Sequence, residues 1–250
     1  MAESLKRIVT LTGRNIKEML RDPLSLVFTV ALPLAMEVLF YAIFHGLTEQ
    51  FEMIYLAPGI VVFSQSFLTL FTSILISTDR SSKFLTRLFV SKAKPHEFIL
   101  SYALAVLPIA LLTAILFFFV GGIIDTSVFK VNAIWCVLTA IVPAAFFVGL
   151  GILFGSVANE KTVGGLCSIA IMGQSVLSGM WFPVEGLGDT MTTIMKVLPF
   201  KNATDLIKNV LSGITDLYAD FLIPLAIVAA YALVTITVAI IVFKHKMKED

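Results

Sequence analysis

Residues 56–77 read LAPGIVVFSQSFLTLFTSILIS, and residues 79–89 follow with DRSSKFLTRLF. The first stretch has no charged side chain and has about the 20 residues that a helix needs to cross a bilayer. The second stretch carries three basic side chains, yet a helix over it would have one apolar face, formed by Phe84, Leu85, Leu88 and Phe89. The pattern therefore predicts a membrane span followed at once by a short helix with one basic and one apolar face.

The whole chain shares the character of the first stretch. Hydrophobic residues make up 58% of its 250 residues, charged residues make up 14%, and the mean hydropathy is +0.96. Such values are typical of membrane proteins. We predict an all-α integral membrane protein, a single transmembrane domain over residues 1–250 with six transmembrane helices, at 26–44, 56–77, 98–120, 133–155, 163–182 and 221–243.

The basic residues indicate the orientation. If both termini lie on one side, 14 of the 18 Lys and Arg side chains lie on that side. Because cytoplasmic loops carry the excess of basic residues, we expect a multi-pass protein of the cell membrane with both termini cytoplasmic. The first 25 residues hold five basic groups and no compact apolar run, so we expect no cleavable signal there.

The pattern of residues 1–23 predicts an amphipathic elbow helix, a short helix along the membrane surface that leads into the first span. Its apolar side chains recur at helical spacing, so the helix is expected to lie in the membrane interface with its basic side chains toward lipid head groups. Asp22 and Pro23 follow it, and they suit the cap and the first position of the next helix.

Residues 183–215 are expected on the outer side. Glycines and prolines interrupt the helical pattern after Trp181, and two short amphipathic helical patterns follow. The segment either re-enters the outer leaflet or lies on the membrane surface, with Trp181 as an interfacial anchor.

Few polar side chains lie inside the predicted spans. Glu37, Gln65 and Gln174 are expected at a common depth, with Thr69 on the same helix face as Gln65. Intramembrane polar groups often mark a substrate path, which is one interpretation of these four residues. The other is structural, with a neutral Glu37 donating a hydrogen bond to Gln65. Gly149, Gly151 and Gly155 predict close helix packing, within one subunit or across a dimer.

The sequence has few motifs that could bind phosphate or metal or carry out catalysis. The stretch GSVANEKT, residues 155–162, resembles a phosphate-binding loop, but Glu160 replaces the second glycine and no strand precedes it. No nucleophile–base pair or metal-ligand spacing stands out, and Cys136 and Cys167 lie within predicted spans as small apolar side chains. A net charge of +1 gives no reason to expect a nucleic-acid partner. A transporter is therefore favoured over an enzyme.

Three stretches together resemble the permease subunits of type-2 ABC exporters, over essentially the whole chain. They are RNIKEMLRDPLSL (14–26), the basic loop after the second span, and SGMWFPVEGL followed by VLPFKNATDLI (178–187 and 197–207). In that family the last pattern forms an outer re-entrant hairpin, and Pro183, Pro199 and Asp205 match it in order. This chain has Gly-Leu-Gly where the family often has a second proline.

The resemblance implies that residues 79–94 form a cytoplasmic coupling loop that docks on a separate ATPase subunit. Lys83 and Arg87 would supply charge, and Phe84, Leu85, Leu88 and Phe89 an apolar plug. Without the resemblance, a basic loop held on lipid head groups would be the simpler interpretation. The family works as a dimer, with a second copy or a paralogue, and ATP and Mg²⁺ belong to the ATPase, so this chain is expected to bind no cofactor.

The expected function is therefore efflux, moving a drug, antimicrobial peptide, lipid or glycan out of the cytoplasm. An ion-coupled secondary transporter and a non-transporting assembly or immunity protein are the alternatives. The first would have several intramembrane charges and paired broken helices, whereas this chain has one such charge and no repeat.

Overall fold

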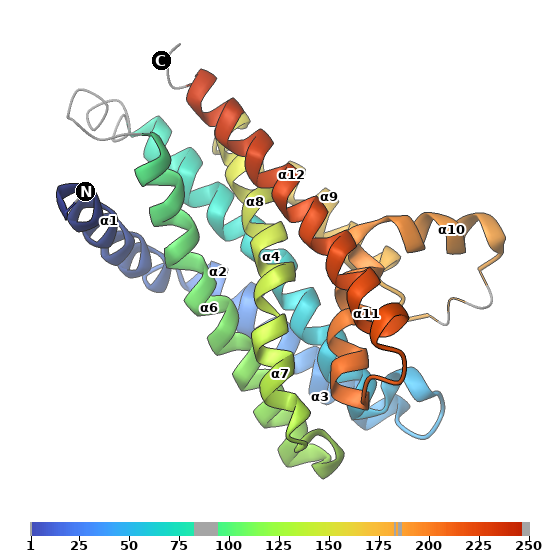
Figure 1. The fold of residues 1–250 in the computed structure, drawn as a ribbon. Helices are drawn as coiled ribbons and strands as arrows, with labels where there is room; N and C mark the ends of the chain where they lie inside the picture. Colours follow the sequence, from blue (N-terminus) through green and yellow to red (C-terminus); the bar gives the residue numbers. More distant parts are fainter. Residues whose placement is uncertain (1, 83–94, 183, 185–186, 247–250) are drawn as a thin grey trace.

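A computed structural model of the protein describes residues 2–82, 95–182, 184 and 187–246 (Figure 1). Helices and turns make up these described residues, with no strand among them. The main helices are α1 (Ala2–Leu20), α2 (Pro23–Leu26), α3 (Leu32–Phe44), α4 (Met53–Ser81), α6 (Pro95–Ile124), α7 (Asn132–Thr139), α8 (Ile141–Val157), α9 (Val163–Leu177), α10 (Asp189–Val197), α11 (Pro199–Ser212) and α12 (Ile223–Lys246). Short π or 3-10 turns are η1 (Val27–Ala31), η2 (Glu49–Phe51), η3 (Thr126–Val128) and η5 (Leu217–Leu222).

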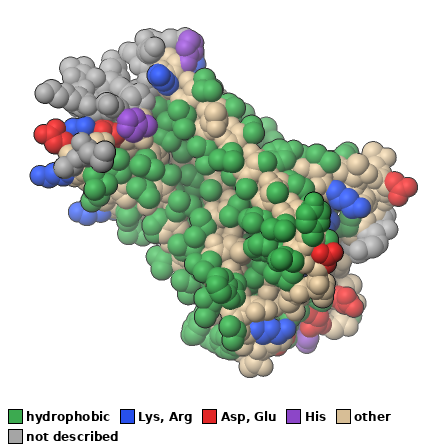
Figure 2. All heavy atoms as spheres, viewed as in Figure 1, with side chains coloured by type: hydrophobic (Ala, Val, Ile, Leu, Met, Phe, Trp, Pro, Cys, Tyr) green, Lys and Arg blue, Asp and Glu red, His purple; other side chains and the backbone are tan. Residues whose placement is uncertain are grey.

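Five helical stretches in the described part of the chain are long and apolar enough to cross a membrane: Pro23–Phe44, Met53–Ser81, His96–Ile124, Asn132–Val157 and Leu217–Lys246. They contain the predicted spans 26–44, 56–77, 98–120, 133–155 and 221–243, each a few residues longer. Figure 2 shows a broad apolar surface over them, with charged side chains gathered toward its ends and on the protruding α10.

The predicted span 163–182 is wrong in its extent. Helix α9 ends at Leu177 and has 15 residues, a length of about 22 Å at 1.5 Å per residue. The chain then turns at Gly179, whose φ of +71° suits glycine because it lacks a Cβ. Helix α9 is therefore too short to cross a ~30 Å hydrocarbon core by itself.

The bundle has two distinct ends. The basic end contains α1, the C-terminal end of α4, the N-terminal end of α6, the turn 158–162 and the C-terminal end of α12 (Figure 1). The hairpin end holds the connections 45–52, 125–131 and 213–216, together with α11. Both termini thus lie at the same end of the molecule.

Helix α4 lies at the centre of the bundle, where it packs against α3, α6, α8, α9 and α11. Its approach to α8 depends on glycine: a Cβ on Gly151 would lie 2.6 Å from the Thr72 Cβ, and one on Gly155 would lie 2.8 Å from the Ser73 carbonyl oxygen. Gly149 faces α12 instead, 2.8 Å from the Thr235 hydroxyl by the same measure. The predicted close packing within one subunit is confirmed for these three glycines.

Candidate coupling site

Helix α1 covers the segment predicted as an elbow and lies along α6, close to the end of α4. Ile8, Asn15 and Met19 are buried on its inner side. The Asp22 carboxylate accepts a hydrogen bond from the Ser25 amide at 3.3 Å, so it caps α2 as expected. The elbow is therefore part of the packed structure.

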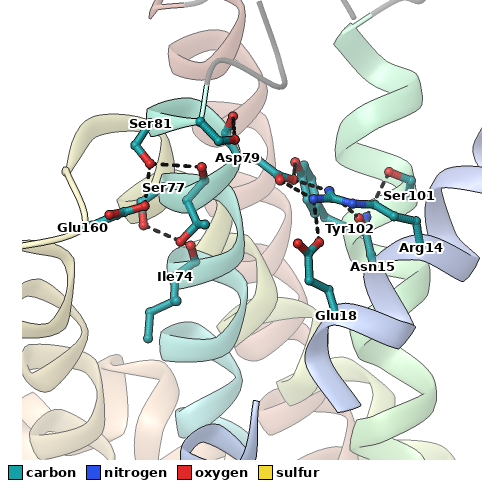
Figure 3. A network of polar contacts seen from close by, with 12 residues as sticks. Arg14, Asn15, Glu18, Ile74, Ser77, Asp79, Ser81, Ser101, Tyr102 and Glu160 are labelled. Carbon is teal, nitrogen blue, oxygen red and sulfur yellow. Dashed lines mark hydrogen bonds and ion pairs between the residues drawn. The ribbon is translucent and has the colours of Figure 1, made fainter. Parts of the chain in front are cut away.

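Arg14 on α1 binds Asp79 near the end of α4 (Figure 3). Its two terminal nitrogens donate to the two carboxylate oxygens at 2.6 and 2.5 Å, and the Tyr102 hydroxyl of α6 donates to the same carboxylate at 2.6 Å. Asp79 is 1% exposed. Burial disfavours the charge of Arg14, but its hydrogen bonds to Asp79 and the Asp79 charge outweigh this and raise the pKa of Arg14.

Arg7 makes a second pair of the same kind at the start of α6. Its guanidinium donates to Glu97 at 2.9 and 3.0 Å, and the Ser4 hydroxyl donates to Glu97 at 2.5 Å. Glu97 is fully buried. Arg7 and Arg14 are seven residues, or about two turns, apart, so both lie on the same side of α1. One face of α1 therefore binds both Asp79, which precedes residues 83–94 in the chain, and Glu97, which follows them.

Arg80 and Ser81 make a third anchor. The Arg80 guanidinium donates to three carbonyl oxygens at the end of α8 and just beyond it, at 2.6–3.3 Å, those of Gly155, Ser156 and Ala158. Helix C-termini leave carbonyl groups without partners and favour a cation there. The Ser81 hydroxyl donates to Glu160 (Figure 3). The stretch that resembles a phosphate-binding loop thus contacts the end of α4.

These anchors correct two sequence predictions. Residues 79–81 belong to α4, so the predicted coupling loop 79–94 begins too early. Arg7 and Arg14 bind buried carboxylates of the protein, so their predicted placement toward lipid head groups is wrong. The predicted docking residues, Lys83, Phe84, Leu85, Arg87, Leu88 and Phe89, lie outside the described residues.

Glu37 is buried near the hairpin end. A Cβ on Gly121 would lie 3.0 Å from Glu37 Oε1 and 3.3 Å from the sulfur of Met53, which is the first residue of α4. The same Cβ would lie 3.4 Å from the Ala57 Cβ, and Gln65 lies eight residues beyond Ala57 along α4, or about 12 Å. The expected common depth of Glu37 and Gln65 is therefore wrong, because α3 and α4 are offset along their axes.

The expected hydrogen bond between Glu37 and Gln65 is also wrong. Among the residues that the structure describes, neither carboxylate oxygen of Glu37 has a hydrogen-bond partner. The Gln65 amide nitrogen donates instead to the Ala140 carbonyl oxygen at 3.0 Å, at the break between α7 and α8. Pro143 accounts for a break here, since it cannot donate to the carbonyl four residues before it.

Thr69 and Gln174 also join helices. The Thr69 hydroxyl donates to the Phe147 carbonyl oxygen of α8 at 3.0 Å, and the Gln174 amide nitrogen donates to the Thr204 hydroxyl of α11 at 3.0 Å. Interhelical hydrogen bonds of this kind stabilise membrane bundles. The four candidate substrate-path residues therefore point to different neighbours, and this geometry favours structural roles for Gln65, Thr69 and Gln174.

The segment predicted as an outer hairpin contains two helices, α10 and α11, as the sequence predicts. Pro199 is the first residue of α11, and Asp205 forms an ion pair with Lys201 one turn away. Helix α11 packs its apolar face against α4, α7 and α12 through buried Leu206, Ile207, Val210 and Leu211. Pro183 lies outside the described residues. Helix α11 is thus part of the bundle core and not a loosely attached surface helix.

Trp181, the expected interfacial anchor, is partly buried against two other helices. Its ring centroid lies 4.8 Å from that of Phe40 on α3 and 6.0 Å from that of Phe63 on α4. The indole N–H donates to the Ser175 hydroxyl at 3.1 Å. Its neighbour Met180 covers Gly59 of α4, where an added Cβ would lie 3.1 Å from the Met180 Cβ. The turn after α9 is therefore inserted between α3 and α4.

Comparison with known families agrees with this architecture. Residues 6–211 match the family described as ABC-2 type transporter. A comparison with curated proteins gave no match. The matched region begins within α1 and ends within α11, so it includes all the anchors around residues 83–94.

Proposed function

Because the chain belongs to the ABC-2 type transporter family, we propose that it is the membrane-spanning subunit of an ATP-driven exporter. In this proposal the basic end faces the cytoplasm, a separate ATPase subunit binds there and supplies ATP hydrolysis with Mg²⁺, and a second permease copy or paralogue completes the assembly. The cargo belongs to the range of drugs, antimicrobial peptides, lipids and glycans. The excess of basic residues at this end supports the orientation.

The observation that carries the proposal is the anchoring on both sides of residues 83–94. Asp79 precedes this segment and Glu97 follows it, and both are buried carboxylates paired with arginines of α1. Separating such a pair would leave an uncompensated buried charge, which is costly. A movement imposed on residues 83–94 would therefore be transmitted to α1, α4 and α6 together.

The third anchor extends this unit toward the rest of the bundle. Arg80 holds the end of α8, and α8 packs against α12. Tyr102 adds α6 to the Arg14–Asp79 pair. A small displacement at the basic end thus acts on several membrane helices at once, as an ATPase-driven change of access requires.

Residues 84 and 88 provide the test. The double substitution Phe84→Asp and Leu88→Asp should abolish co-purification of the ATPase subunit with the tagged permease, because it places charge in an apolar interface. Leu47→Asp, at a 71% exposed position of the hairpin end, is the matched control and should retain the ATPase. If the double variant keeps both the ATPase and transport, residues 83–94 are not the coupling element.

A further inference from the structure

A polar pocket of about 340 Å³ lies at the hairpin end, between α10, α11 and the turn after α9. Three lysines line it, one from α10 and two from α11: Lys196, Lys201 and Lys208. Gln50 and Thr192 add uncharged polar groups. The volume lies within the range of small-molecule sites, which begins at about 300 Å³.

The charge of this pocket is unusual for its end of the molecule. Of the 13 Lys and Arg residues in the described part of the chain, four lie in α10, α11 and the connections of the hairpin end, and Lys130 is the one of these four that does not line the pocket. Among the described residues that line it, Asp205 is the one carboxylate, and it is paired with Lys201. The described lining residues therefore carry three positive charges and one negative charge, and an anionic ligand would relieve the repulsion among the lysines.

Two of the three lysines, Lys201 and Lys208, are held in place by side-chain contacts. The Lys208 ammonium lies 4.4 Å from the centre of the Tyr55 ring, and the Lys201 side chain is only 19% exposed. The Asn202 amide donates to the carbonyl oxygens of Lys196 and Leu198 at 2.8 and 2.7 Å, which fixes the junction of α10 and α11. A preorganised arrangement loses less entropy when a ligand binds.

We propose that this pocket binds a phosphate group, carried by a lipid head group or by a small phosphorylated molecule at the membrane surface. Lysine ammonium groups bind phosphate as point charges, and charge-assisted hydrogen bonds are among the strong ones. The site deepens the proposed function and rests on it for its location, since the pocket faces the outside when the basic end faces the cytoplasm.

The test measures ligand-induced stabilisation of the purified full-length chain in neutral detergent, which does not depend on orientation. The probes are inorganic phosphate, glycerol 3-phosphate and phosphatidylglycerol in mixed micelles, with phosphatidylcholine as the zwitterionic control. We expect an increase in thermal stability that rises with probe concentration and weakens with added salt. Stabilisation by the soluble phosphates identifies a small-molecule site, whereas stabilisation by phosphatidylglycerol alone identifies a lipid site.

The matched variants are Lys196→Gln with Lys208→Gln, and Lys130→Gln. The double variant should weaken phosphate binding about tenfold or more, because it removes two charged hydrogen-bond donors. Lys130 is exposed outside the pocket, so its substitution should leave binding unchanged. No stabilisation by any phosphate probe, or equal affinity in the double variant and the wild type, overturns the proposal.

Orientation is measured separately. A cysteine introduced at Glu49, at the hairpin end, should react with a membrane-impermeant reagent added to intact cells. Phosphate binding without labelling at position 49 would retain the pocket and contradict the proposed orientation. Labelling without phosphate binding would retain the orientation and contradict the pocket.

Discussion

The two ends of the bundle are held together by different interactions. At the basic end, buried carboxylates are paired with arginines, as Asp79 is with Arg14. At the hairpin end, aromatic rings and neutral hydrogen bonds dominate, as in the contact of Trp181 with Phe40 and the bond from Gln174 to Thr204. A buried ion pair imposes one geometry, because any other leaves charge unpaired in an apolar environment. Aromatic contacts accept a range of angles and distances.

The basic end is therefore expected to be rigid, and the hairpin end is expected to be more adaptable. If the proposed ATPase subunit acts on the basic end, we expect that end to move as a unit. The hairpin end can repack without separating an ion pair between two helices, because its Lys201–Asp205 pair lies within α11. Three substitutions test the contrast, and thermal unfolding of the detergent-purified chain measures each.

Arg14→Ala should have the largest effect, a loss of about 3–5 kcal/mol, because it leaves the Asp79 carboxylate buried without its cation. Lys17→Ala is the control on the same helix, at an exposed position, and should change stability by less than ~0.5 kcal/mol. Adding Asp79→Ala to Arg14→Ala should recover part of the loss, since no unpaired charge then remains. A loss no larger than that of Lys17→Ala would mean that the basic end is not fixed by this pair.

Trp181→Leu should cost less, about 1–3 kcal/mol, because leucine keeps much of the apolar burial while the two aromatic contacts with Phe40 and Phe63, worth ~0.5–1.5 kcal/mol each beyond that burial, are lost. The other tryptophan of the chain, Trp135, is 59% exposed on α7 and provides a matched control. Trp135→Leu should be close to neutral. Equal losses for the two variants would show that the insertion of the turn between α3 and α4 contributes little.

Gln174→Leu should have the smallest effect, about 0.6 kcal/mol and at most about 1.7 kcal/mol, the average and the largest value measured for interhelical hydrogen bonds in a membrane protein. The substitution removes the donor to the Thr204 hydroxyl and approximately keeps the side-chain volume. Thr204→Val should cost a similar amount, and the double variant should cost little more than either single one. Fully additive losses would mean that the two side chains do not interact.

The sequence predicts the membrane helices well because their signal is local. Apolar runs of the required length identify five crossing helices, and Asp22 and Pro23 mark the start of the first. The length of α9 was overestimated because Met180 and Trp181 are apolar enough to extend the run, although Gly179 already turns the chain. The insertion of these two residues between other helices is a tertiary feature with no local signal.

The anchors at the basic end were missed for a different reason. Arg14 and Asp79 are 65 residues apart, and Arg7 and Glu97 are 90 apart, and each alone resembles an ordinary surface charge. The sequence does contain a signal for these pairs. Arg7 and Arg14 are seven residues apart on one helix, and the basic segment 83–94 has one acidic residue shortly before it, Asp79, and one shortly after it, Glu97. The depth of Glu37 and Gln65 could not be predicted for another reason. The position of a residue within its own apolar run does not show how α3 and α4 are offset relative to each other.

The central position of α4 has a consequence for the synthesis of the protein. Helix α4 carries several hydroxyl groups that donate to carbonyls within their own helix, as Ser64 and Ser66 do, so these can enter a bilayer already satisfied. Gln65 and Thr69 instead donate to carbonyl oxygens of residues 140 and 147, which the ribosome adds 75 and 78 residues later. Until α7 and α8 arrive, the polar face of α4 has to be shielded by the insertion machinery or by water. The hydrogen bonds of Gln65 and Thr69 in the second membrane helix can therefore form only after the fourth membrane helix has been synthesised.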